Sequence, residues 1–144
     1  MLIISGNTDR QRDTGSRIMA LSNDDIHDAA MRLHQAEKAR KQIRPFSQTH
    51  PAITLDDAYA IQQRLMQRRL AAGERVVGKK IGVTSQAVMN MLGVFQPDFG
   101  WLTDGMVYNE GEAVPMSRLI QPKAEGEIAF VLKKTLQGPG ISVA

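Results

Sequence analysis

The sequence QPKAEGEIAFVL at residues 121–132 decides how the rest of the chain is interpreted, because a short polar approach runs directly into an apolar stretch. Side chains alternate between the two faces of a strand, which places Glu125 and Glu127 together on one face. Both faces become apolar after Glu127, and this predicts a strand that is covered on both sides. Same-face residues lie only about 6.5–7 Å apart along a strand. Two carboxylates this close at the start of a covered strand therefore need a cation.

Carboxylate oxygens are the ligands that hard divalent ions prefer. The Glu125 and Glu127 pair therefore predicts Mg²⁺ or Mn²⁺, and not zinc, which prefers nitrogen and sulfur ligands. The alternative is that both glutamates line an exposed strand face, as charged residues commonly do. His27, His34 and His50 share no spacing that indicates a second metal site.

Upstream, the sequence RVVGKKIGVT at residues 75–84 predicts another strand. Lys80 lies on the same face as Gly78 and Gly82, and residues without side chains on both sides leave room for a ligand. The alternative is a weak edge strand whose lysines prevent aggregation. A further strand is expected at residues 106–108.

Between these strands, Asp98 lies in the turn-type cluster QPDFG at residues 96–100. Pro97 fixes one dihedral angle and Gly100 permits another, so we expect Asp98 on a rigid loop. An equal alternative is that Asp98 is a turn residue that accepts hydrogen bonds from its own backbone.

Two helices are predicted ahead of the first strand. One begins at Ser22, where Asp25 completes a capping box, and ends near Gln42. The other begins at Thr54 and ends at Gly73, which is suited to a left-handed stop. With strands following, the fold class is α+β.

Composition excludes several function classes. A length of 144 residues is usual for one domain. Residues 1–18 are polar and show no apolar periodicity that could bury a face, so we expect a disordered leader there, followed by a single domain at 19–144. The 18 basic and 15 acidic residues are intermixed, which gives no indication of a nucleic-acid partner. The absence of cysteine is compatible with the cytoplasm, and no apolar run is long enough for a membrane span.

Three motifs, in this order and spacing, resemble the 2-keto-4-pentenoate hydratase family of the fumarylacetoacetate-hydrolase superfamily. They are VGKKIGVT at 77–84, LGVFQPDFG at 92–100 and the 121–132 stretch, within a likeness over roughly 22–140. The resemblance implies N-terminal helices followed by the first strands of a mixed β fold. Family members are considerably longer, with a third acidic metal ligand and most of the β-rich body beyond this point. The chain is therefore expected to be a truncated, N-terminal portion of such a domain.

The resemblance implies a metal-dependent hydratase of aromatic meta-cleavage catabolism, which adds water to 2-hydroxypenta-2,4-dienoate to give 4-hydroxy-2-oxopentanoate. Glu125 and Glu127 would be metal ligands, and Lys80 and Asp98 acid/base or substrate-orienting groups. Implied partners are a small 2-oxo or 2-hydroxy dienoic acid, further copies of the chain, and a decarboxylase or aldolase of the same pathway. Two alternatives stay open: a 4-oxalocrotonate decarboxylase of the same superfamily, or an inactive chain that only associates with full-length partners.

Overall fold

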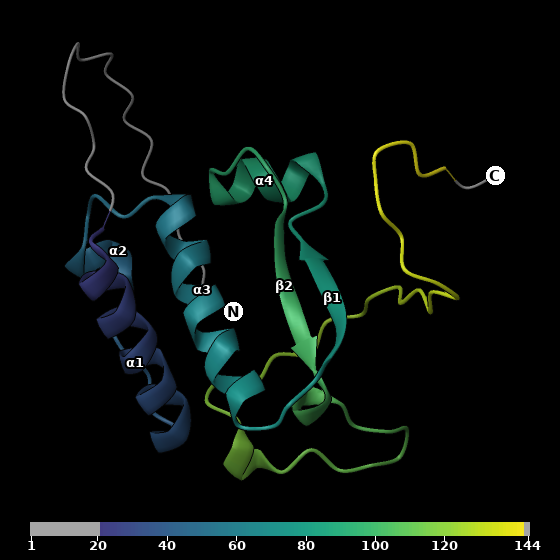
Figure 1. The fold of residues 1–144 in the computed structure, drawn as a ribbon, viewed down its shortest axis with the longest axis horizontal. Coiled ribbons are helices and arrows are strands. Elements are labelled where there is room, and N and C mark those ends of the chain that lie inside the picture. The colour runs from purple at the N-terminus through teal and green to yellow at the C-terminus, as the bar shows by residue number, and fades with distance from the viewer. Residues whose placement is uncertain (1–20, 143–144) are drawn as a thin grey trace.

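The computed structural model describes residues 21–142 and is α+β, as predicted. Two long helices lie side by side, next to a small antiparallel sheet, and the chain ends in an extended segment (Figure 1). The helices are α1 (Asn23–Ala39), α2 (Phe46–Thr49), α3 (Leu55–Ala71) and α4 (Gln86–Leu92), and the strands are β1 (Val76–Gly82) and β2 (Asp98–Thr103). Short 3₁₀ turns follow at Asp104–Met106 and Met116–Arg118. The expected leader at 1–18 lies outside the described residues.

Both long helices begin where the sequence predicts, because each start carries a capping box. At α1 the Asp25 backbone N–H donates to Ser22 Oγ over 3.1 Å, and the Ser22 N–H donates back to Asp25 Oδ2 over 3.2 Å. Thr54 and Asp57 repeat this arrangement at α3. These bonds satisfy backbone donors that a helix start otherwise leaves unpaired. The helix α1 ends earlier than predicted, since Arg40 adopts a left-handed conformation (φ 53°).

The core lies between α1 and α3. Ala29 and Ala30 of α1 are each only 2% exposed, and Ile61 of α3 is fully buried. Small alanine side chains let the two helices approach closely, and the larger Ile61 and Phe46 fill the space between them. This helical pair is the platform beside which the sheet lies.

The sheet is antiparallel, and its register sets the positions of the candidate site residues. Lys80 pairs with Gly100, and Gly82 pairs with Asp98. Since Lys80 and Gly82 share a face of β1, the Lys80 and Asp98 side chains emerge on the same face of the sheet. The strand expected at 75–84 is confirmed as β1. The expected rigid loop at Asp98 is wrong, because Asp98 is the first residue of β2 and its backbone pairs with Gly82.

Two other strand predictions are also wrong. Of the strand expected at 106–108, Met106 ends the 3₁₀ turn Asp104–Met106, and residues 107 and 108 have no regular secondary structure. Residues 121–132 also form no regular secondary structure. Ile128 is 84% exposed and Phe130 is 83% exposed, so neither face of this segment is covered. A strand requires a hydrogen-bonding partner, and within residues 21–142 β1 and β2 pair only with each other. The larger mixed β fold is therefore not formed by the described part of the chain.

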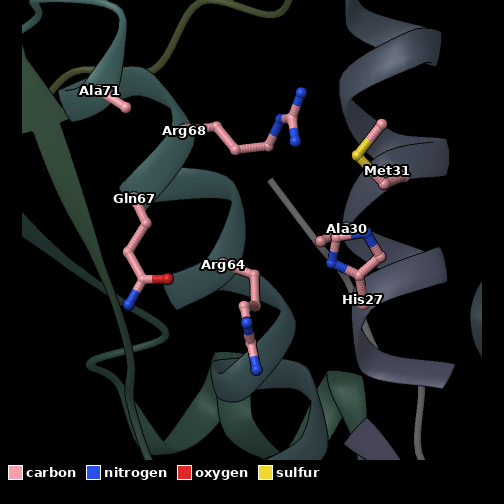
Figure 2. Close-up of a pocket in the computed structure, with 7 residues that line it drawn as sticks. All are labelled: His27, Ala30, Met31, Arg64, Gln67, Arg68 and Ala71. Carbon is pink, nitrogen blue, oxygen red and sulfur yellow. The ribbon is translucent and has the colours of Figure 1, made fainter. Parts of the chain in front are cut away.

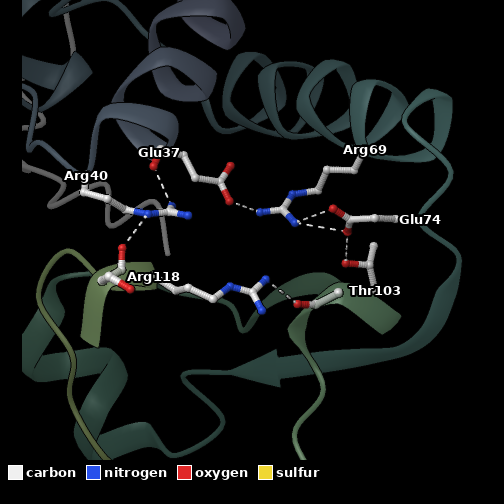
Figure 3. A network of polar contacts seen from close by, with 8 residues as sticks. Glu37, Arg40, Arg69, Glu74, Thr103 and Arg118 are labelled. Atoms are coloured by element: carbon white, nitrogen blue, oxygen red, sulfur yellow. Dashed lines mark hydrogen bonds and ion pairs between the residues drawn. The ribbon is translucent and has the colours of Figure 1, made fainter. Parts of the chain in front are cut away.

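A polar network joins the helices to the end of the sheet (Figure 3). Arg69 of α3 forms ion pairs with Glu37 of α1 and with Glu74, and the Thr103 hydroxyl at the end of β2 donates to Glu74. Further along, Arg118 donates to the Gly105 carbonyl over 3.0 Å. Within residues 21–142, no helix has the length and apolar character needed to cross a membrane.

Candidate active site

The structure brings Lys80 and Asp98 together on one face of the sheet. Lys80 Nζ lies 3.7 Å from Asp98 Oδ1, and the two side chains are 41% and 37% exposed. An ammonium and a carboxylate at this separation form an ion pair that solvent weakens but does not abolish. They place one proton donor and one proton acceptor side by side, where a small molecule can reach them.

Glycines surround this pair on the same sheet face. A Cβ atom on Gly82 would lie 2.4 Å from Asp98 Oδ1 and 3.1 Å from Lys80 Nζ, and one on Gly100 would lie 3.4 Å from Lys80 Cγ. By contrast, a Cβ on Gly78 would meet only the Leu102 side chain, at 3.7 Å. The missing side chain that matters most to the ion pair is therefore the one at position 82.

One oxygen of the Asp98 carboxylate lacks a hydrogen-bond donor. Oδ1 is buried but accepts no hydrogen bond from the described residues, since 3.7 Å to Lys80 Nζ exceeds hydrogen-bond distance. A buried acceptor without a donor costs about 1–3 kcal/mol. Oδ1 therefore retains unused capacity to accept a hydrogen bond.

Helix α3 contributes two residues that the sequence did not single out. Gln62 Nε2 donates to the Phe99 carbonyl over 3.3 Å and would lie 3.8 Å from a Cβ on Gly100. The Tyr59 ring stacks on Phe99 at 4.5 Å between centroids, and its hydroxyl is buried without a partner among residues 21–142. Their spacing of three places both on one helix face, but nothing in the sequence shows that this face meets β2.

The structure does not bring Glu125 or Glu127 into polar contact with Lys80, Asp98 or any other described residue. Both are exposed, and neither forms a hydrogen bond or an ion pair with another described residue. No cluster of three or more metal-ligating side chains exists within residues 21–142. Two carboxylates have the right donor chemistry for a hard cation but supply too few of the six or more oxygens it needs. The described residues alone therefore do not fit a metal centre.

A cavity of about 230 Å³ lies between α1 and α3, away from the predicted residues (Figure 2). His27 and Met31 line it from α1, and Arg64, Gln67 and Arg68 from α3. A second cavity of about 180 Å³ lies between α3 and Trp101 of β2, and Gln62 lines it. Neither cavity includes Lys80, Asp98 or the glutamate pair.

No protein-family model matches the chain. Named relatives do. The 2-hydroxypent-2,4-dienoate hydratase of Pseudomonas putida is 60% identical over 120 residues, which are 83% of this chain and 54% of the relative. The 2-hydroxyhexa-2,4-dienoate hydratase of Comamonas testosteroni is 52% identical over 119 residues, 81% of this chain and 45% of the relative. The chain thus spans about half the length of the relatives it matches.

Among solved structures, 4-oxalocrotonate decarboxylase from Pseudomonas putida G7, complexed with calcium and acetate, matches with a TM-score of 0.67 and 33% identity. The match covers 69% of this chain and 39% of that protein. The same decarboxylase complexed with magnesium and adipate matches with a TM-score of 0.57.

Proposed function

Because this chain belongs to the 2-keto-4-pentenoate hydratase family, we propose that it carries acid and base groups of an enzyme that adds water to 2-hydroxypenta-2,4-dienoate, giving 4-hydroxy-2-oxopentanoate. The observation that carries the proposal is the Lys80 and Asp98 pair, 3.7 Å apart on a glycine-lined sheet face. The names of three relatives, which are hydratases of 2-hydroxypent-2,4-dienoate, 2-hydroxyhexa-2,4-dienoate and 2-keto-4-pentenoate, support the substrate class.

The proposed reaction needs positioned proton donors and acceptors. The dienol first becomes a 2-oxo-3-enoate, and water then adds to the carbon remote from the ketone. Each step moves a proton, and a positioned side chain accelerates such transfers by about 10²–10⁴. Lys80 is the donor of the pair and also attracts the negatively charged acid. Asp98, whose side chain is 37% exposed, is the acceptor.

We further propose that Glu125 and Glu127 supply two carboxylates of a divalent-cation site, with Mg²⁺ or Mn²⁺ as the ion. Their donor chemistry supports this, as do the calcium and magnesium complexes of the related decarboxylase. The remaining oxygens have to come from outside residues 21–142, which makes further copies of the chain or another polypeptide part of the proposal. Association with a decarboxylase or aldolase of the pathway, and a cytoplasmic location, stay proposals as well.

A second candidate is decarboxylation of a 2-oxo dicarboxylic acid, favoured by the structural match to 4-oxalocrotonate decarboxylase. The hydratases are the better guide, because their identity to this chain reaches 60%, whereas that of the decarboxylase is 33%.

A product assay separates the two. We would supply the 144-residue chain with Mg²⁺ and either 2-hydroxypenta-2,4-dienoate or 4-oxalocrotonate, and follow products by NMR. A chimaera, in which this chain replaces the matched region of the Pseudomonas putida hydratase, would be assayed in parallel. Formation of 4-hydroxy-2-oxopentanoate by the chimaera supports the hydratase. Carbon dioxide release from the second acid without hydration of the first would favour the decarboxylase, and no turnover by the chimaera would contradict both.

A further inference from the structure

We propose that Gly82 is a positioning residue: its lack of a side chain is what allows the Asp98 carboxylate to lie beside the Lys80 ammonium. The effect of this positioning on turnover rests on the proposed function, but the positioning itself is a property of the sheet. It concerns a residue of β1, the strand that carries Lys80, and this residue pairs with Asp98 of β2.

The contact distances carry the proposal. A Cβ at position 82 would lie 2.4 Å from Asp98 Oδ1, far inside the closest approach that real Cβ atoms make. The 3.1 Å to Lys80 Nζ is less severe, because the end of a lysine side chain moves easily. Of the two members of the pair, Asp98 is therefore the one that position 82 controls.

Backbone conformation does not explain this glycine. The described glycines with positive φ are Gly73, Gly93, Gly111 and Gly140, and Gly82 is not among them. Any residue can adopt the backbone of position 82, so an alanine there is limited only by what its Cβ meets. Glycine is required at position 82 because the Asp98 carboxylate occupies the space that a Cβ would take.

The carboxylate has to yield if a Cβ is added, because the backbone on both sides is held. Gly82 and Asp98 are paired across the two strands, and this pairing fixes their separation. Directly after Gly82, Val83 has a φ of 56°, which a β-branched residue rarely adopts, so the chain leaves the strand through a constrained turn. The remaining freedom is rotation of the Asp98 side chain, which takes Oδ1 away from Lys80.

A thermal-denaturation cycle tests the positioning without turnover. Gly82→Ala should change the Tm of the full chain less favourably than it does in an Asp98→Ala background, where no carboxylate meets the new Cβ and replacing a glycine at an accommodating position restricts the unfolded chain. Gly78→Ala is the matched control, since its Cβ meets only Leu102, and it should not lower Tm in either background. An equal change of Tm from Gly82→Ala in both backgrounds would overturn the proposal.

A crystal structure of the Gly82→Ala chain provides a second measurement. The separation of Lys80 Nζ and Asp98 Oδ1 should exceed the 3.7 Å of the parent, and it should be retained in Gly78→Ala. An unchanged separation in Gly82→Ala contradicts the positioning. In the chimaera, Gly82→Ala should reduce kcat by on the order of 10²-fold. Normal turnover with a displaced Asp98 would contradict the proposed role of the pair and leave the positioning intact.

Discussion

Arg69 of α3 and Glu74, which precedes β1, form an ion pair with 3.1 Å between Nη1 and Oε2, and Glu74 also accepts a hydrogen bond from the Thr103 hydroxyl of β2. The helical platform and the sheet therefore meet at one carboxylate. The hydrogen bond from Thr103, and then the bond to Arg69 with its positive charge, lower the pKa of Glu74 below its ordinary range.

This lowered pKa predicts a pH dependence of stability. The contribution of Glu74 is fully present above about pH 4.3, the ordinary pKa of glutamate, and is lost as pH falls through the lower pKa of the folded state. Glu74→Gln should cost about 1–2 kcal/mol of unfolding free energy at neutral pH and should flatten the acid limb of the stability curve. Urea unfolding between neutral pH and pH 3 measures both.

Glu110→Gln is the control for Glu74, because Glu110 is exposed and forms no hydrogen bond or ion pair with a described residue. The low-pH part of the stability curve of this variant should match that of the parent. Parallel behaviour of the two variants would show that Glu74 does not couple the helices to the sheet.

Removal of the two capping boxes should lower the unfolding free energy by unequal amounts. Asp57 is 3% exposed, and burial raises its pKa, but the hydrogen bonds from Thr54 and from the Leu21 backbone more than offset burial and hold the pKa below its ordinary range. Asp57→Ala should cost about 2 kcal/mol, because it removes a cap and leaves the partly buried backbone N–H groups of Leu21 and Thr54 unpaired. The matched variant at the exposed box, Asp25→Ala, should cost less. Chemical denaturation of both variants compares them, and a larger loss at Asp25 would be the contrary result.

Turnover should depend on the Lys80 and Asp98 pair. In the chimaera, Lys80→Met and Asp98→Asn should each lower kcat by about 10²–10⁴ if the side chains transfer protons. Lys79→Met is the control, because Lys79 lies on the other sheet face with its Nζ 5.7 Å from the Trp101 ring centroid, and its kcat should equal that of the parent. Near-normal kcat in both pair variants would return Lys80 to the role of an edge-strand lysine.

Metal binding by this chain alone should be weak. Glu125 and Glu127 supply two carboxylates, so water has to complete the coordination of Mg²⁺ or Mn²⁺. Calorimetry with Mn²⁺ should show only weak binding to the parent and none to the Glu125→Gln, Glu127→Gln double variant. Equal binding by both proteins would exclude the glutamates as ligands.

Apolar side chains on the C-terminal segment should make the chain self-associate. Val131 is fully exposed, as are most of Ile128 and Phe130, and exposed apolar segments of extended backbone promote association. Light scattering should therefore show particles larger than a monomer, and an Ile128→Lys, Phe130→Lys variant should reduce their size. A parent chain that stays monomeric at high concentration would contradict this expectation.

The features that the sequence predicted correctly depend on neighbouring residues. The starts of α1 and α3 were readable because Ser22 and Thr54 cap the helices with atoms only a few residues away. Asp98 was misplaced on a loop because its position depends on pairing with Gly82, sixteen positions earlier in the chain. Turn-forming neighbours gave a local signal that this pairing overrides.

The same limit explains the error at residues 121–132 and the omission of Gln62. Alternation of apolar residues describes which faces would be buried but not what covers them, and in residues 21–142 no strand pairs with this segment. Gln62 was absent from the predicted site because its role depends on α3 lying against the Phe99 carbonyl. The open sheet face around Lys80 was predictable from its flanking glycines, whereas the 3.7 Å approach of Asp98 from the other strand was not.

The route of the chain from β1 through α4 to β2 has a kinetic consequence. Lys80 and Asp98 belong to one short, continuous unit, so bringing them together closes only a small loop, and small loops close at low entropic cost. The ion pair should therefore form as soon as this hairpin-like unit folds, without waiting for residues 104–142. Hydrogen exchange should find the amides of β1 and β2 protected together, as one cooperative opening unit.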